Sequence, residues 1–226
     1  SIATQSMARD ILPKMILSIA PSWMGDYLTK ALGKLALIFA EAMTLKAGAL
    51  APYNLKGAQL NWKKTISPVT TQMWRSVGHS QNAFFVESFV DEIAYKAGID
   101  PMEFRESRLP KDSKQLRVLQ KVKEMSGWAK KKGKSMGVAA HFSYKSYAAA
   151  VIEVDNKDDL KVKNVWIALD CGIAINPDGV HTQLISSVIF GLSAALFGKI
   201  EIEDSKVIQD NFDGYPLLTL RQSPEI

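Results

Sequence analysis

The spacing of apolar residues predicts helices in the first part of the chain. Within residues 1–50, apolar side chains recur every three or four positions, as at Leu28, Ala31 and Leu35. The most apolar run, LALIFA at residues 35–40, is much shorter than the roughly 20 residues that a bilayer span needs. We therefore expect this segment to pack on its own protein. Peripheral membrane anchoring by residues 22–47 is the alternative, and liposome co-sedimentation would distinguish the two.

A second helical pattern follows residue 78. Phe85, Phe89 and Ile93 recur at helical spacing and predict one apolar face. Glu87 and Asp91 fall largely off that face, where acids four residues apart are usually solvated or ion-paired. We expect the phenylalanines to be buried and the two acids to be solvated or ion-paired.

Local signals predict the boundaries of the next helices. Gly98 is suited to the residue after a helix C-terminus, because glycine adopts left-handed backbone angles without strain. Asp100 then offers an N-cap, followed by Pro101 at the first helical position and a glutamate at the third. Asp112 or Ser113 is expected to cap a further helix, which stops near Gly127.

After Gly133 the pattern changes to strands. Residues 136–143, 148–155 and 160–170 are rich in apolar and β-branched residues, and DNKDD at 155–159 predicts a hairpin turn between the last two. An Asn-Pro-Asp-Gly turn leads into a helix at 180–198, and short strands are expected at 199–204 and 211–220. This mixture, without regular strand–helix alternation, predicts an α+β fold. We expect a helix-rich segment at 1–70 and an α+β domain at 71–226.

Charge, cysteine count and histidine spacing limit which partners and which binding sites the sequence can support. The net charge of +5 is mild and its positive residues are dispersed, so no concentrated basic face for nucleic acid is expected. A single cysteine excludes an internal disulfide and a multi-cysteine metal site. The three histidines are scattered and lack metal-ligand spacing, so we expect no metal site made of side chains alone.

The loop WRSVGHSQ, residues 74–81, carries the chemistry of an anion or cofactor site. Arg75 can donate two parallel hydrogen bonds to a phosphate or carboxylate. Gly78 allows close backbone approach, and Gln81 can both donate and accept at the edge of a heterocycle. Because such loops are common, these residues alone favour a structural role for Arg75.

The segment WRSVGHSQNAFFVESFVDEIAYKAGIDPMEFR resembles the molybdopterin-binding large subunits of the isoquinoline 1-oxidoreductase type, in the xanthine dehydrogenase and aldehyde oxidase superfamily. PYNL, SGW, GVAAHFS, AAAVIEVD, IALDCGIAINPDGVHTQ, IFGLSAAL and NFDGYPLLTL agree in the same order. The resemblance runs from about Pro52 to the last residue. We interpret the chain as a C-terminal fragment of such a large subunit, with residues 1–70 left from a preceding cofactor-binding domain.

The resemblance implies a set of cofactor contacts. Arg75, Gly78 and Gln81 take the positions of an Arg-x-x-Gly-x-x-Gln loop beside the molybdenum centre and pterin. Val77 falls where related enzymes often place an aromatic ring against the substrate, which makes it a candidate substrate contact without an aromatic clamp. Gln183 matches a pterin-contacting glutamine, although the family's Gln-x-Glu-Gly pattern reads QLIS here.

The resemblance also implies the chemistry and the partners. Such enzymes hydroxylate N-heterocycles or aldehydes with water as the oxygen source. Their cofactor is molybdopterin, with the cytosine dinucleotide form as one variant, and electrons leave through iron–sulfur clusters on a small partner subunit. Their glutamate base lies in a Gly-Glu-Pro segment that this sequence lacks, as it lacks their Met-Gly-Gln-Gly loop.

Two functional hypotheses follow from the resemblance. In the first, the chain is part of a molybdenum hydroxylase and is inactive alone, so it contributes no catalytic residue of its own. In the second, it is a divergent, non-catalytic domain that serves subunit assembly without the cofactor.

Overall fold

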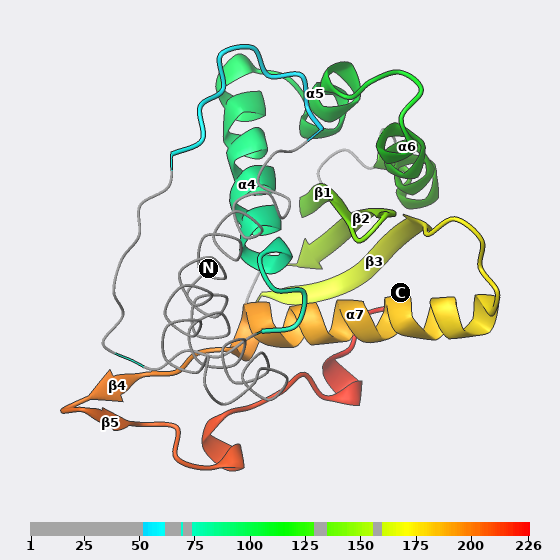
Figure 1. Ribbon diagram of the computed structural model, residues 1–226. Helices are drawn as coiled ribbons and strands as arrows, with labels where there is room; N and C mark the ends of the chain where they lie inside the picture. Colours follow the sequence, from blue (N-terminus) through cyan, green and yellow to red (C-terminus); the bar gives the residue numbers. More distant parts are fainter. Residues whose placement is uncertain (1–51, 62–68, 70–73, 129–134, 156–159) are drawn as a thin grey trace, which may run out of the picture. The chain divides into compact units, whose positions relative to one another are not determined.

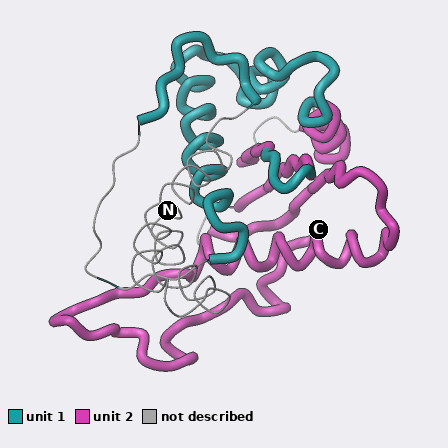
Figure 2. Tube along the Cα trace, viewed as in Figure 1, with its two compact units in different colours: residues 1–116, 141–145 teal, residues 117–140, 146–226 magenta. Residues whose placement is uncertain are grey.

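The computed structural model describes residues 52–61, 69, 74–128, 135–155 and 160–226. The chain divides into two compact units, coloured separately in Figure 2. Unit 1 contains residues 1–116 and 141–145, and unit 2 contains residues 117–140 and 146–226. The helices expected within residues 1–50 lie outside the described residues, and a domain boundary near residue 70 stays a prediction.

In unit 1, two helices meet at a tight connection that local chemistry predicts. Helix α4 (His79–Ala97) ends at Gly98, whose φ of 65° is left-handed and whose N–H bonds back to the helix carbonyls. Helix α5 (Pro101–Arg108) begins at Asp100. The Asp100 Oδ1 accepts from the backbone N–H groups of Met102, at 2.9 Å, and Glu103, at 3.1 Å. Both predicted boundaries are confirmed.

The buried face of α4 is not the predicted one. Phe85 and Phe89 are 61% and 59% exposed, whereas Glu87, Val90 and Ala94 are buried. The apolar spacing identifies the helix correctly but assigns the wrong face to the interior. The reason is that Glu87 is needed inside unit 1, where it pairs with a buried cation.

That cation is Arg105 on α5, whose side chain is fully buried. Its Nε donates to Glu87 Oε2 at 2.9 Å, and its Nη2 donates to the Glu87 carbonyl at 3.0 Å. The Tyr53 hydroxyl donates to the same carboxylate at 3.0 Å.

Burial alone would lower the pKa of Arg105, but Glu87 and Asp91 together hold that pKa above its usual value. Burial and the nearby Glu87 carboxylate raise the pKa of Tyr53. The guanidinium therefore stays charged and the phenol neutral.

Helix α6 (Lys114–Ser126) follows α5. Ser113, one of the two expected caps, directly precedes it. The Leu116 N–H donates to Ser113 Oγ at 3.2 Å. The helix ends before Gly127, whose φ is 63°. Its buried apolar residues, Leu116, Val118, Leu119 and Val122, follow helical spacing.

A three-stranded sheet follows, in the order β1 (Ser135–Ser143), β2 (Ser146–Asp155) and β3 (Lys161–Asp170) (Figure 1). Strands β2 and β3 run antiparallel from the pair Tyr147–Asp170 to the pair Asp155–Lys161, with one irregularity at Glu153. The sheet and the helices together confirm the α+β class. The hairpin turn expected at 155–159 lies outside the described residues beyond Asp155.

Helix α7 (Pro177–Phe197) follows the sheet in unit 2. Asn176 caps it, accepting from the Gly179 N–H at 3.0 Å, and Pro177 occupies its first turn. Within the described part of the chain, α7 is the one helix long and apolar enough to cross a membrane. Its most apolar 18-residue stretch has a mean hydropathy of 1.5, and 6% of that stretch is buried. Core helices of soluble proteins can have the same length and composition.

The C-terminal region contains less strand than the sequence predicts. The strand expected at 199–204 shrinks to β4 (Ile202–Glu203), which pairs with β5 (Lys206–Val207). The strand expected at 211–220 is wrong, since η4 (Phe212–Gly214) and η5 (Leu220–Gln222) are 3-10 turns. Asn211 Oδ1 caps η4 by accepting from the Phe212 N–H at 2.8 Å, and Pro216 has no N–H to offer a strand ladder.

The last residues return to the sheet. Glu225 forms an isolated parallel bridge with Asn164 on β3. The Val165 N–H donates to the Glu225 carbonyl at 2.8 Å, and the Glu225 N–H donates to the Lys163 carbonyl at 3.1 Å. A segment distant in sequence thus closes part of the β3 edge.

Candidate cofactor-binding site

The turn before α4 has a strained backbone. Ser76 and Val77 both have positive φ, at 69° and 54°, which is a costly conformation for a β-branched valine. The Val77 N–H donates to the Trp74 carbonyl at 3.1 Å, and the His79 N–H donates to the Ser76 carbonyl at 3.0 Å. Ser76 Oγ also bonds to the Arg75 carbonyl and to Ser80 Oγ. Strain of this kind is found preferentially where function requires a particular backbone shape.

The turn leads directly into the amino-terminal end of α4. Gly78 is buried and is the N-cap residue, and no side chain caps the helix. The backbone N–H groups and the positive end of the helix dipole suit an anionic ligand at such a position. Arg75 is exposed at the start of the turn, and Gln81 is half-buried in the first turn of the helix. These residue types fit the phosphate and the heterocycle of a pterin cofactor.

Two histidines meet beside this turn. His79 Nδ1 lies 3.0 Å from His141 Nε2, and the two rings are edge to face at an angle of 76°. The Tyr144 ring lies 5.2 Å from the His79 ring. Burial, reinforced by the proximity of His79, lowers the pKa of His141 to about 4. Burial also lowers the pKa of His79. Both rings are therefore neutral at pH 7, so one nitrogen donates and the other accepts.

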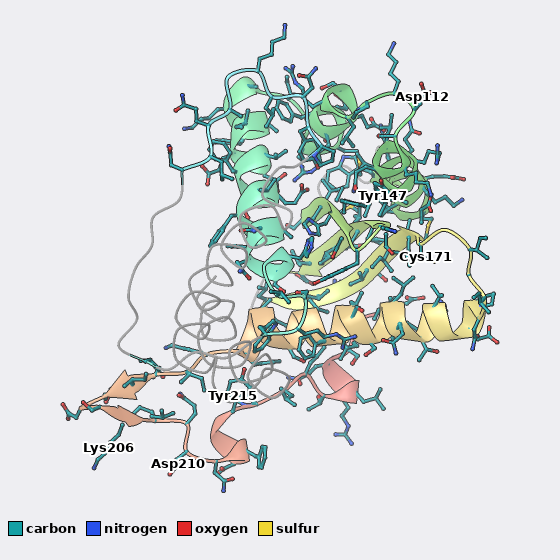
Figure 3. All side chains as sticks on the ribbon, viewed as in Figure 1. Asp112, Tyr147, Cys171, Lys206, Asp210 and Tyr215 are labelled. Carbon is teal, nitrogen blue, oxygen red and sulfur yellow. The ribbon has the colours of Figure 1, made fainter. Side chains whose placement is uncertain are left out.

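In unit 2, the end of β3 and the first half of α7 line a pocket of about 580 Å³. Asp170 Oδ1 accepts from the Gly172 N–H at 3.0 Å, which shapes the loop, and Gly172 has a φ of 80°. Figure 3 shows Cys171 on this loop and Tyr147 on β2. Tyr147 pairs in register with Asp170 at the end of β3. Gln183 lies on the wall of the pocket that α7 forms, together with Val180, Leu184 and Ser187.

The predicted residues thus occur at two locations. In unit 1, Arg75, Val77 and Gly78 lie on the turn before α4, and Gln81 lies in the first turn of that helix. Gln183 lies in the pocket of unit 2. The approach of Gln183 to Arg75 stays a prediction because the two belong to different units.

Sequence reasoning missed two features of unit 1. His79 and His141 are 62 positions apart, and no spacing signal pairs them. The buried Glu87–Arg105 pair did carry a signal, since an acid among the apolar positions of α4 precedes an arginine among the apolar positions of α5. Within the described residues, no group of three or more His, Cys, Asp or Glu side chains could hold a metal ion.

Comparison with known proteins places these residues in a family context. Residues 39–224 match the molybdopterin cofactor-binding domain family. The chain is 33% identical to the beta subunit of isoquinoline 1-oxidoreductase from Brevundimonas diminuta over 160 residues, which cover 67% of this chain and 20% of that protein. It is 27% identical to a subunit of nicotinate dehydrogenase from Pseudomonas putida over 200 residues, which cover 79% of this chain and 17% of that protein.

A third relative bears a name with a different cofactor. The membrane-bound aldehyde dehydrogenase (pyrroloquinoline-quinone) of Gluconacetobacter polyoxogenes is 26% identical over 176 residues, which cover 67% of this chain and 23% of that protein. The chain therefore spans about a fifth of the length of these curated relatives.

Proposed function

The chain belongs to the molybdopterin cofactor-binding domain family, and we propose that it forms part of a molybdenum hydroxylase that acts on N-heterocycles or aldehydes. The family match over residues 39–224 carries this proposal. It gains support from the turn at residues 75–78, where a strained backbone leads into a helix end without a side-chain cap. Two of the relatives are named for N-heterocycles and a third for aldehydes, which supports these two substrate classes.

Each proposed cofactor residue has a distinct role. Arg75 would pair with an anionic group of molybdopterin, Gly78 would let the backbone approach it, and Gln81 and Gln183 would bond to the edge of the pterin. Val77, at the centre of the strained turn, would contact the substrate through its apolar side chain. When bound, the molybdenum centre supplies the redox chemistry that hydroxylates the substrate with oxygen from water.

This chain is proposed to bind and orient the cofactor without completing the reaction. A general base removes a proton during hydroxylation, and in the related enzymes a glutamate of a Gly-Glu-Pro segment has this role. The sequence contains no Gly-Glu or Glu-Pro pair, so no residue of this chain is assigned to that step. Two of the relatives are named as subunits, which supports a partner subunit. The resemblance implies that this partner is a small iron–sulfur subunit that receives the electrons.

Metal analysis of two proteins tests the proposal. One is this chain alone, and the other is the full-length protein with this chain in it, purified with its partner subunit. We expect molybdenum in the full-length protein, dye reduction with isoquinoline, nicotinate or a simple aldehyde, and neither from the chain alone. Arg75→Ala in the full-length protein should lower the molybdenum content, whereas the exposed Lys121→Ala on α6 should leave it unchanged. Turnover by the chain alone, or pyrroloquinoline quinone in place of molybdenum, would overturn the proposal.

One observation favours a second candidate function. Ile185 and Ser186 stand where the family pattern has an acid and a glycine after the pterin-contacting glutamine. A chain with this change could keep the fold for assembly with a partner while binding no cofactor. A full-length protein that forms the complex with its partner and yet contains no molybdenum would establish this alternative.

A further inference from the structure

The turn at residues 75–78 requires support from outside itself. Left-handed backbone angles at two non-glycine residues, Ser76 and Val77, are strained, and they persist only where surrounding contacts fix them. Gly78 provides no side-chain cap for α4. The serine contacts of Ser76 and Ser80 stay within the turn and cannot fix its position against the rest of unit 1.

The histidine pair is suited to give that support. His79 directly follows Gly78 and is two residues from Gln81, and its partner, His141, lies 62 positions away near the end of β1. The contact thus links the first residue of α4 to a distant part of the same unit. Its geometry is specific, because Nδ1 of one ring meets Nε2 of the other at hydrogen-bonding distance.

We propose that the His79–His141 hydrogen bond positions the Arg75–Gln81 turn for the cofactor, and that both histidines are positioning residues that do not touch molybdopterin. This inference rests on the proposed function for its cofactor part, but the effect on the turn itself can be measured without cofactor. The contact needs at least one neutral ring, because two protonated rings would both donate and would repel each other. The titratable groups around the pair include Tyr144, in ring contact with His79, and Arg75 and Lys145, which flank the two histidines along the chain.

Amide hydrogen exchange of this chain tests whether the His79–His141 hydrogen bond fixes the Arg75–Gln81 turn. In His141→Leu, exchange of the backbone N–H groups in residues 74–82 should become about five- to tenfold faster, since one hydrogen bond of typical strength is lost. His141→Gln places an amide near the position of Nε2, and His79→Asn places one near the position of Nδ1. Each of these two variants should keep exchange within about twofold of the wild type. Tyr144→Phe retains the ring contact and is the control that should leave exchange unchanged.

The pH dependence of the turn gives a readout that a purely steric role would not move. The protection factor of residues 74–82, which is the intrinsic exchange rate at each pH divided by the observed rate, should fall once both His79 and His141 are protonated below neutral pH. This fall should be absent in His141→Gln. Equal exchange in His141→Leu and wild type, or the same fall in protection in His141→Gln as in wild type, would overturn the proposal.

Molybdenum analysis separates this inference from the proposed function. In the full-length protein, His141→Leu should lose molybdenum and His141→Gln should retain most of it. If His141→Leu loosens the turn and retains all of its molybdenum, the positioning role is wrong although the proposed function stands. If the wild type contains no molybdenum, the proposed function fails together with the cofactor part, and exchange alone decides whether the pair holds the turn.

Discussion

Glu87 determines which face of α4 is buried, although it is one residue among many apolar ones. Its carboxylate accepts from both Arg105 and Tyr53, so all three polar side chains are satisfied inside unit 1. Two aromatic rings, Phe85 and Phe89, remain on the surface instead. A buried charge costs several kcal/mol unless it is paired, so pairing outweighs the burial of a phenylalanine here.

Removal of the Glu87 carboxylate should therefore destabilise the chain strongly. We expect Glu87→Ala to lower the free energy of unfolding by about 3–5 kcal/mol, because the buried Arg105 guanidinium loses its main partner. Urea denaturation measures the change. The matched control is Lys163→Ala, which breaks an exposed pair with Asp155 and should change stability by less than about 1 kcal/mol. A loss below about 1 kcal/mol in Glu87→Ala would contradict the buried network.

His141 should make the stability of the chain depend on pH. Its pKa is about 4 in the folded chain against 6.5 for the ordinary side chain, so the unfolded state binds a proton first. Stability is then complete above about pH 6.5 and is lost as the pH falls toward 4. We expect a loss of about 1 kcal/mol, allowing for the part of the ring that remains in solvent. Urea denaturation at pH 7 and pH 4.5 measures it, and a loss of the same size in His141→Gln would show that other groups cause it.

At the scale of elements, boundaries that depend on a few neighbouring residues were predictable. Gly98 and Asp100 mark the junction of α4 and α5, and Ser113 and Gly127 mark the two ends of α6. The same approach failed at residues 211–220. There the apolar pattern resembles a strand, but no neighbouring strand pairs with it among the described residues, and a proline removes a donor. Local chemistry fixes a helix end, whereas a strand also needs a partner that sequence alone does not identify.

The Asp100 cap should contribute measurably to α5. Asp100→Ala removes the acceptor of two N–H groups and should lower the free energy of unfolding by about 1 kcal/mol. Asp100→Asn keeps a side-chain oxygen at the cap and should cost only a few tenths of a kcal/mol. Thermal unfolding followed by circular dichroism compares the two variants. Equal losses in both would mean that charge, rather than the cap geometry, is the source of the effect.

At the scale of the whole molecule, the candidate site depends on residues far apart in the chain. The resemblance could name Arg75, Gly78 and Gln81 because they are contiguous in the chain, and their contact with a cofactor stays a prediction. The structure places Arg75 and Gly78 on the turn before α4 and Gln81 in the first turn of that helix. The histidine pair could not be predicted, because its members meet only through the fold. The relation between Gln183 and Arg75 depends on the cofactor that both are proposed to bind.

A cross-link can test that relation. Cys171 is the single cysteine of the chain and lines the same pocket as Gln183. If the two units share one cofactor, Ser80→Cys at the start of α4 should be joined to Cys171 by a short bifunctional maleimide in the molybdenum-containing protein. Tyr95→Cys, at the other end of α4, is the matched control and should give little product. Equal cross-linking from both positions would contradict a shared site.

The bridge between Asn164 and Glu225 has a consequence for the order of folding. Strands β2 and β3 are neighbours in the chain and can pair after closing a short loop, whereas Glu225 reaches β3 only after the whole of α7 and the C-terminal turns have been traversed. The entropy of loop closure rises with the length of the intervening chain, and contacts of high sequence separation form slowly. The hairpin is therefore expected to be protected early in refolding and the Val165 N–H late, so pulse-labelled exchange should resolve two steps within a single strand.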